Sequence, residues 1–228
     1  MKINTLIKTT CLAVVMLVTA CSKDKNAAPG GTSFTQYYIA GQYSANLSST
    51  ATNVPVPYAI IFNSDSKCTF ADAVFGVVVG SYTYSNGHLV TNFGETGGSL
   101  VATFDFTVTN GTITQASPDG LGLLTYKLEI TPATNAFSNG QYTGGVTTVD
   151  GTYIAYLSFS DSQFNIGQSG YNTPDIVYTL QNNAVATRVF NNVTSVFVFD
   201  NGAVMMMNYI PPAAVNGSSA YEYGTLTK

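Results

Sequence analysis

The stretch LVATFDFTVTNG, residues 100–111, decides the fold, because every second residue in it is apolar up to Val108. The even-numbered positions therefore fall on one face of an extended chain, while Thr103, Asp105 and the other odd-numbered positions after Val101 fall on the opposite face. This period is typical of an antiparallel strand with one buried face. Asn110-Gly111 then supplies the positive φ angles that a two-residue hairpin turn requires. The stretch predicts a strand, a tight turn and an antiparallel partner.

The same pattern continues along the rest of the chain. Residues 124–130 alternate between apolar and polar side chains, and Asn86-Gly87 and Asn201-Gly202 repeat the turn signal. Beyond residue 33 no window shows helical periodicity. We therefore expect an all-β protein.

Short motifs recur in the same order in the two halves of the chain, at offsets close to one hundred residues. The pairs are Gly41-Gln42-Tyr43 and Gly140-Gln141-Tyr142, Ser64-Asp65-Ser66 and Ser160-Asp161-Ser162, Tyr82-Thr83 with Asn86 and Tyr178-Thr179 with Asn182, and Phe106 to Gly111 with Phe199 to Gly202. Collinear matches that carry the same strand and turn pattern indicate an internal repeat. The repeat predicts two tandem domains, residues 34–133 and 138–228.

Each copy contains about eight short segments with strand character. In the first copy they are 36–47, 56–63, 67–72, 76–85, 88–93, 99–109, 112–117 and 122–131; in the second they are 140–147, 152–159, 163–167, 174–181, 184–190, 193–200, 203–209 and 220–227. Antiparallel strands of this number can close into a small up-and-down barrel whose interior is filled by side chains and leaves little room for a ligand. The alternative is one continuous barrel or sandwich built from both halves. In strand count and in its Gly-x-Tyr opening, each copy resembles the small lipocalin-like domains of bacterial lipoproteins.

The N-terminal segment predicts the compartment. A basic start with Lys2 and Lys8 precedes a short apolar run, too short to span a bilayer, as in a secretory signal over residues 1–20. Val18-Thr19-Ala20-Cys21 resembles the lipobox of bacterial lipoproteins, in which the cysteine is lipidated. The resemblance implies lipidation of Cys21, a flexible tether over residues 21–33 and an outer-membrane lipoprotein of a Gram-negative-type envelope, periplasmic or surface-exposed. An ordinary cleaved signal with an incidental Cys21 is the alternative.

Composition argues against several classes of function. Loss of the signal leaves six basic against twelve acidic residues, a formal charge of −6, which disfavours nucleic acid. No glycine-rich phosphate loop precedes a helix, so we expect no nucleotide and no cofactor. With one histidine in the chain and only Cys68 left unmodified in the folded part, a zinc site lacks ligands, and no loop carries enough acids for calcium. Cys68 shares a strand face with Phe70 and is expected to be buried.

Candidate catalytic groups are few. His88 follows the Asn86-Gly87 turn, where a solvated side chain is expected, and it is the only possible centre of an acid-base triad. The acids that could pair in a glycan hydrolase lie in turns or on a polar strand face. They are Asp65, Asp105, Asp161 and Asp200. We expect no enzymatic activity.

Tyrosine is the residue type most suited to contacts with a partner, since the chain has fifteen tyrosines and no tryptophan. A tyrosine offers an apolar face and a hydroxyl group to a protein or glycan partner. The candidates for such contacts are Tyr37, Tyr38, Tyr171, Tyr221 and Tyr223. The alternative is that these side chains cap the barrel ends. The sequence favours a lipid-anchored, non-enzymatic binding or accessory module; the alternatives are a lipocalin-like carrier of a small apolar ligand and, less favoured, a glycan hydrolase.

The lipid anchor gives the first testable prediction. Cys21→Ser should abolish incorporation of labelled fatty acid and move the protein out of the membrane fraction, because acyl chains contribute about 0.8 kcal/mol per buried CH₂ group. The measurement is fractionation of labelled cells that express wild type or variant. Membrane association that survives the substitution would contradict lipidation at Cys21.

Overall fold

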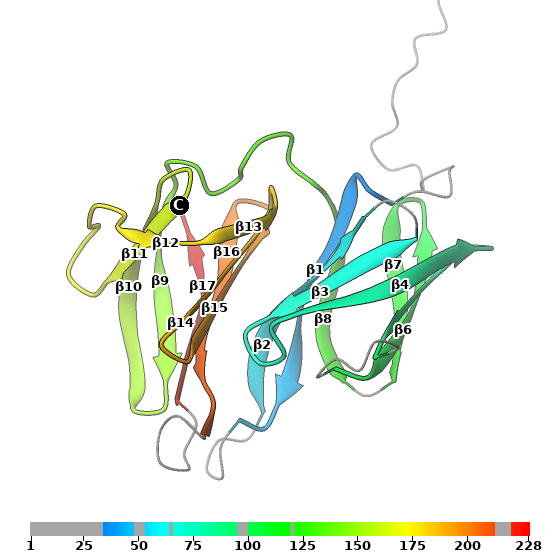
Figure 1. Ribbon diagram of the computed structural model, residues 1–228, viewed down its shortest axis with the longest axis horizontal. Coiled ribbons are helices and arrows are strands. Elements are labelled where there is room, and N and C mark those ends of the chain that lie inside the picture. The colour runs from blue at the N-terminus through cyan, green and yellow to red at the C-terminus, as the bar shows by residue number, and fades with distance from the viewer. Residues whose placement is uncertain (1–33, 48–52, 64–65, 95–99, 120, 213–219) are drawn as a thin grey trace, which may run out of the picture.

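The structure is a computed structural model that describes residues 34–47, 53–63, 66–94, 100–119, 121–212 and 220–228. Its strands form two antiparallel sheets, one of eight strands and one of nine, and each sheet curls into a nearly closed barrel (Figure 1). The lipidation candidate Cys21 lies outside the described residues.

The first barrel is a meander that closes on its first strand. Its strands are β1 (Tyr37–Ala45), β2 (Val54–Phe62), β3 (Lys67–Asp72), β4 (Val77–Ser85), β5 (His88–Phe93), β6 (Ala102–Thr109), β7 (Thr112–Asp119) and β8 (Gly122–Ile130). Consecutive strands pair from β1 to β7, and β8 pairs with the other edge of β1. The opening of the sheet therefore lies between β7 and β8.

The second barrel repeats this plan with one interruption. Its strands are β9 (Gln141–Thr148), β10 (Gly151–Phe159), β11 (Gln163–Gly167), β12 (Ile176–Val177), β13 (Thr179–Asn182), β14 (Val185–Phe190), β15 (Val193–Asp200), β16 (Ala203–Ile210) and β17 (Ala220–Thr227). Its first strand β9 pairs with its last strand β17, as β1 pairs with β8.

The expected strand over residues 174–181 is divided at Tyr178. Before this residue β12 pairs with β11, and after it β13 pairs with β14. The backbone N–H of Tyr178 still donates to the carbonyl of Ser162, 3.1 Å away, which directly precedes β11. One strand of the repeat thus becomes two, which is why the second sheet has nine strands.

The expected fold class, an all-β chain with two tandem antiparallel barrels, is confirmed. The alternative of a single continuous barrel or sandwich is wrong, because no strand of one sheet pairs with a strand of the other among the described residues.

Hydrogen bonds reveal which residues of the two copies are equivalent. The N–H of Tyr82 donates to Ser66 as that of Tyr178 donates to Ser162. At the start of each copy, the N–H of Tyr37 donates to the carbonyl of Phe34 (2.7 Å), and the N–H of Gly140 donates to that of Phe137 (2.8 Å).

When the two copies are aligned on Phe34 and Phe137, their Gly-Gln-Tyr motifs do not coincide. They are offset from each other by four residues along the strand. Four is an even number, so both motif tyrosines, Tyr43 and Tyr142, still point to a buried side of the strand. The motif therefore reflects a shared need for a buried tyrosine and not a shared position.

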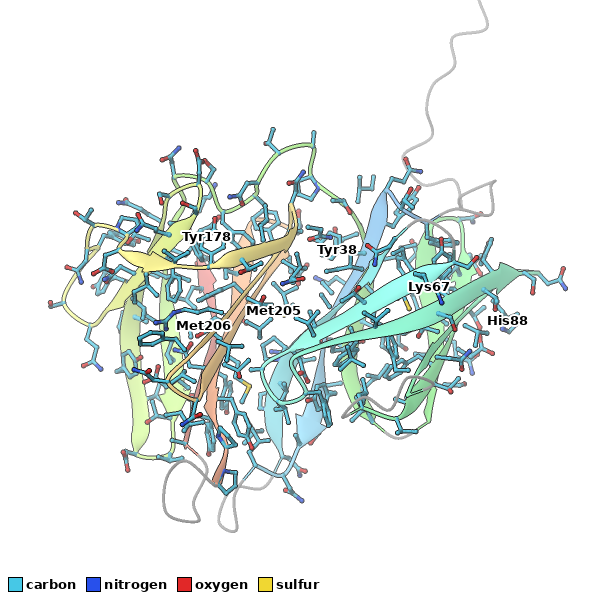
Figure 2. All side chains as sticks on the ribbon, in the orientation of Figure 1. Tyr38, Lys67, His88, Tyr178, Met205 and Met206 are labelled. Carbon is cyan, nitrogen blue, oxygen red and sulfur yellow. The ribbon has the colours of Figure 1, made fainter. Side chains whose placement is uncertain are left out.

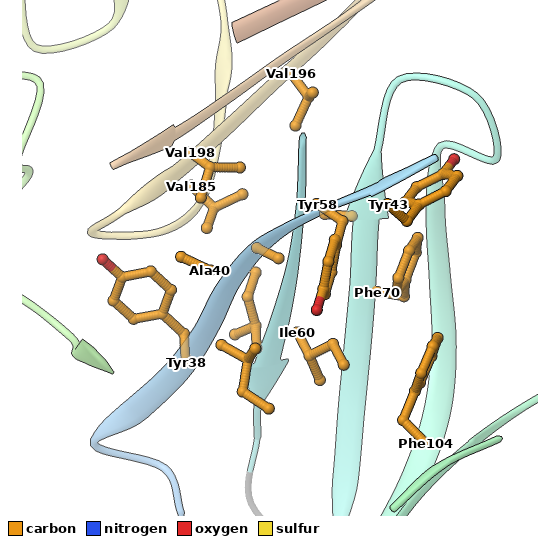
Figure 3. Close-up of a cluster of buried hydrophobic side chains, with 14 of the residues drawn as sticks. Tyr38, Ala40, Tyr43, Tyr58, Ile60, Phe70, Phe104, Val185, Val196 and Val198 are labelled. Atoms are coloured by element: carbon orange, nitrogen blue, oxygen red, sulfur yellow. The ribbon is translucent and has the colours of Figure 1, made fainter. Parts of the chain in front are cut away.

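Aromatic rings fill the interior of the first barrel. Tyr58 stacks on Phe70 with ring centroids 5.4 Å apart, and Phe70 stacks on Phe104 at 6.2 Å (Figure 3). All three side chains are fully buried. This interior agrees with the expectation that so small a barrel packs its own side chains and leaves little room inside.

The two barrels share an apolar wall. Val185, Val196 and Val198 of the second barrel belong to the same buried cluster as Tyr38 and Ala40 of the first (Figure 3). Successive methionines of β16 divide between the barrels, since Met205 joins that cluster whereas Met206 joins the core of the second barrel (Figure 2).

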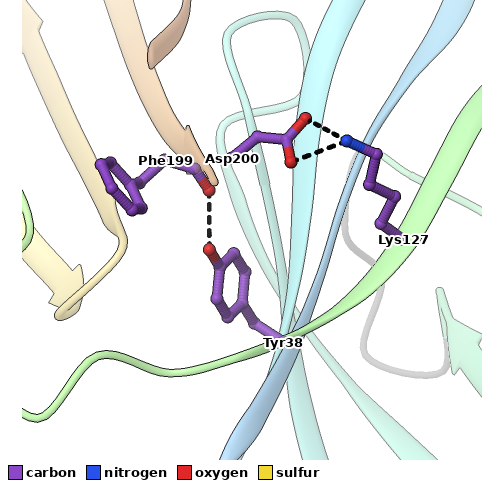
Figure 4. Close-up of polar contacts among 4 residues, drawn as sticks. All are labelled: Tyr38, Lys127, Phe199 and Asp200. Carbon is purple, nitrogen blue, oxygen red and sulfur yellow. Dashed lines mark hydrogen bonds and ion pairs between the residues drawn. The ribbon is translucent and has the colours of Figure 1, made fainter. Parts of the chain in front are cut away.

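Polar contacts also join the two barrels beside this apolar wall. The Tyr38 hydroxyl donates to the carbonyl of Phe199 at 2.6 Å, and Lys127 Nζ lies 2.8 Å from Asp200 Oδ2 (Figure 4). Both contacts join the first barrel to β15. The orientation of the second barrel is thus fixed by packing and by directional bonds.

Candidate functional site

One end of the second barrel is open and forms a cavity of about 580 Å³, here called the mouth. It lies where the β9–β10 turn, the end of β16 and the start of β17 meet. Its lining is Thr148, Val149, Asp150, Tyr153, Gln168, Val193, Asn208, Ile210, Ala220, Tyr221 and Glu222.

A row of polar side chains crosses three neighbouring strands at the mouth. Asn208 on β16 is opposite Glu222 on β17, and Glu222 is opposite Thr148 on β9. Asn208 follows Met206, and Thr148 follows Val146, by two residues on the same face. The barrel interior therefore changes from apolar to polar at this level.

The mouth presents hydrogen-bond acceptors. Asn208 Nδ2 donates to Glu222 Oε2 at 3.0 Å, which leaves Asn208 Oδ1 buried with no partner among the described residues. Burial, with the charge of Glu222 as a smaller cause, raises the pKa of the Tyr153 phenol, so this hydroxyl remains a neutral donor and acceptor. No lysine, arginine or histidine is among the lining residues.

Aromatic packing closes the barrel below the mouth. The ring of Phe197 lies 4.7 Å from that of Phe164 and 5.3 Å from that of Phe159, centroid to centroid. These side chains are buried in the core of the second barrel. The mouth is consequently a shallow site above a packed core. Its polar row and its volume were not expected, since barrels this small predicted an interior filled by side chains.

The five tyrosines proposed as contact residues do not gather at one site. Tyr221 lines the mouth, and the ring of Tyr223 lies 6.0 Å from it on the same strand. Tyr171 is on the loop after β11, where its ring packs against Tyr156. Tyr37 is partly buried beside the core of the first barrel.

The assignment of Tyr38 as a surface contact is wrong. Its side chain is only 1% exposed, because it packs in the wall between the barrels and its hydroxyl binds the carbonyl of Phe199. Strand position alone could not separate a tyrosine that faces solvent from one that faces a second domain.

The candidate catalytic groups lie apart from the mouth. His88 Nδ1 lies 2.9 Å from Asp105 Oδ1, and both side chains are exposed (Figure 2 labels His88). Asp161 accepts a hydrogen bond from Ser138, and Asp200 pairs with Lys127. Asp65 lies outside the described residues.

The remaining cysteine is part of the core. Cys68 is fully buried, and desolvation raises the pKa of its thiol to about 12. No group of three or more metal-ligating side chains occurs in the part of the chain that the structure describes.

Sequence reasoning missed one buried acid, Asp72. Its Oδ1 accepts backbone N–H groups of Val74 (3.1 Å), Phe75 (2.7 Å) and Gly76 (3.1 Å), and its Oδ2 accepts the hydroxyl of Tyr43 at 2.5 Å. The bonds hold the β3–β4 turn, in which Gly76 has a φ of 79°. Asp72 is therefore a structural residue of the first barrel.

Comparison with known proteins does not identify a family. No protein-family model, characterised protein or solved structure in the comparisons matches the chain. The fold and the mouth therefore define the chain as a pair of tandem, nearly closed antiparallel barrels, one packed and one open at its end. Among the described residues, no helix has the length and apolar character needed to cross a membrane.

Asp72 gives a prediction about pH. Desolvation raises the pKa of Asp72 from 3.8 to about 6, despite the hydrogen bonds that favour its charged form. The folded protein then binds this proton more tightly than the unfolded chain, so the stabilisation is complete below about pH 4 and is lost as the pH rises through about 6.

The test compares urea unfolding of wild type and Asp72→Asn. The free energy of unfolding of wild type relative to the variant should fall by on the order of 2 to 3 kcal/mol between about pH 4 and about pH 7. Asp150→Asn, which changes an exposed acid in a turn, is the matched control. A difference between wild type and Asp72→Asn that does not change with pH contradicts the assignment.

Proposed function

We propose that this protein is a membrane-tethered, non-enzymatic binding protein whose second barrel binds a neutral, hydroxyl-rich small ligand, such as the end of a glycan, at its mouth. The observation that carries the proposal is the polar row of Thr148, Asn208 and Glu222 on the inner face of the barrel, because no lysine, arginine or histidine is among the described residues that line the mouth. Arg188 continues the same row two strands beyond Asn208, past Ser195, and does not line the mouth. Acceptors placed in this way suit a ligand that brings donors, and they disfavour phosphate and carboxylate ligands.

Sugars match the mouth in three respects. Their hydroxyl groups can donate to the Glu222 carboxylate, and the ring of Tyr153 offers an apolar face. The volume of about 580 Å³ lies in the range of small-ligand sites in proteins.

Two sequence features support attachment to the cell envelope. The lipobox resemblance at Val18 to Cys21 gives the anchor, and residues 21–33 give a spacer. We propose an outer-membrane lipoprotein, periplasmic or surface-exposed, in which the packed first barrel holds the open second barrel away from the lipid. Two barrels that each close by first-to-last strand pairing also support the lipocalin-like resemblance.

The carrier of an apolar ligand is less well supported. Val149, Val193 and Ile210 give the mouth an apolar rim, but the interior below is occupied by Phe159 and Phe197. An apolar ligand would have to displace packed rings, which interiors at crystal-like density resist.

A hydrolase has one observation in its favour, because Asp150 and Glu222 both line the mouth. A glycosidase needs a general acid whose pKa is raised by its surroundings. Asp150 is exposed in the turn between β9 and β10, and Glu222 already accepts a hydrogen bond from Asn208. Binding without turnover is therefore the better proposal.

Calorimetric titration with neutral and acidic oligosaccharides tests the proposal. Chitotriose and maltotriose serve as neutral probes, and a trigalacturonate serves as the anionic probe. At least one neutral sugar should bind, and the anionic sugar should bind at least about tenfold more weakly because it meets Glu222 without a compensating cation.

Variants locate the binding site. Glu222→Gln and Asn208→Leu should each weaken binding of the neutral sugar about tenfold or more, since the first removes the charged acceptor and the second removes the amide that holds the Glu222 carboxylate in place. Asp105→Asn, on the exposed surface of the first barrel, is the matched control and should bind as wild type does. Absence of binding, or equal binding by Glu222→Gln, contradicts the proposal, and steady release of reducing ends from the bound sugar would favour the hydrolase.

A further inference from the structure

The sheet of the second barrel has a gap between β12 and the end of β14, here called the slot. β13 pairs with β14 only as far as Thr187, and β12 pairs only with β11. A cavity of about 460 Å³ opens between the two strands. It is lined by Asp175, Ile176, Val177, Thr179, Thr187, Arg188, Val189 and Phe190.

Backbone groups of one residue on each side point into this slot. Phe190 pairs with Val193 across a two-residue turn, so the backbone N–H and C=O of Phe190 point toward β15. The backbone groups of successive residues point to opposite edges of a strand, so those of Val189 point toward the slot. On the other side the N–H of Tyr178 donates to Ser162 in the turn before β11, so alternation turns the groups of Val177 toward the slot. The side chains of Val177 and Val189 are 63% and 73% exposed.

Two open strand edges that face each other define the chemistry of an occupant. Only an extended polypeptide can present backbone donors and acceptors on both of its sides at the spacing of a β-sheet. Exposed valines beside an open edge also match a partner strand that carries apolar side chains.

Two charged residues, Asp175 and Arg188, line the slot and add a second requirement. Asp175 Oδ1 accepts a hydrogen bond from Asn165 Nδ2 at 2.8 Å. Arg188 is the only arginine of the chain, and its guanidinium carbon lies 4.7 Å from the ring centroid of Phe190. It forms no ion pair with any residue that the structure describes. An unpaired guanidinium on a protein of negative net charge is complementary to a carboxylate, which it can bind with two parallel hydrogen bonds.

We propose that the slot binds an extended segment of a partner polypeptide by strand addition, with a carboxylate of that segment placed against Arg188. The site goes beyond the proposed sugar site, since none of its lining residues lines the mouth. The two sites are neighbours, because Phe190 of the slot pairs with Val193 of the mouth.

Selection from a random peptide display library tests this proposal with the full chain as bait. The peptides have about ten residues, the upper length of ordinary strands. Wild type should select peptides that alternate apolar and polar residues around one Asp or Glu. Arg188→Glu should instead select Lys or Arg at the same position, a reversal that misfolding cannot produce.

Binding constants and amide exchange locate the bound peptide. Arg188→Gln should weaken a selected acidic peptide about tenfold or more, the effect of losing a charge-assisted hydrogen bond. Glu222→Gln in the mouth is the control and should leave peptide binding unchanged. Bound peptide should protect the amide protons of Val177 and Val189 from exchange.

Three outcomes of these measurements would overturn the proposal. They are a library that yields no enrichment, a charge preference that Arg188→Glu does not change, and protection that appears away from Val177 and Val189. Self-association of the chain that Val189→Pro abolishes would show that a second copy occupies the slot, which also overturns it.

Discussion

The apolar wall between the barrels is the contact on which the arrangement of this protein depends. It requires the start of β14 and the middle parts of β15 and β16 to be buried on both faces. On β15, Phe197 points into the second barrel while Val196 and Val198 point toward the first. A strand that is covered on both sides is stabilised by apolar burial at every position, at about 25 cal/mol per Å².

The apolar wall also explains why the mouth has a fixed orientation relative to the first barrel. β16 and β17 contribute Asn208 and Glu222 to the mouth with one face, while Tyr209 and Tyr221 lie in the shared cluster with the other face. The site is therefore part of the same strands that join the barrels. The packing between the barrels thus sets the direction of the mouth relative to the first barrel.

Much of the fold could be predicted from the sequence, because its strands alternate and its turns carry asparagine at positive φ. Asn86, Asn110 and Asn201 have φ angles of 51°, 51° and 46°, as the Asn-Gly turns predict. The wall had a signal as well, since the uninterrupted apolar run Val204 to Met207 is typical of a strand buried on both faces. The pattern of apolar residues within one strand does not show which other part of the protein covers its second face.

The mouth could not be predicted, because it depends on the pairing of distant strands. Thr148 meets Glu222 only through closure of β9 on β17, and no spacing in the sequence fixes that register. Asp72 was equally hidden, since one acid among polar neighbours gives no sign that three backbone N–H groups will converge on it.

The two tandem barrels share a plan but differ in how closely they are packed. In the first, β4 is one strand and stacked rings fill the interior; in the second, the equivalent strand is broken at Tyr178 and the barrel is open at one end. The same scaffold thus supplies a packed support and an open barrel.

Differential scanning calorimetry tests the coupling of the barrels most directly. Wild type should unfold in one transition whose calorimetric and van't Hoff enthalpies agree, since neither barrel can separate without exposing the shared wall. Val198→Asp places a charge in that wall and should divide the transition into two. Two resolved transitions in wild type, or a variant that unfolds as wild type does, would contradict the claim that the two barrels form one unit.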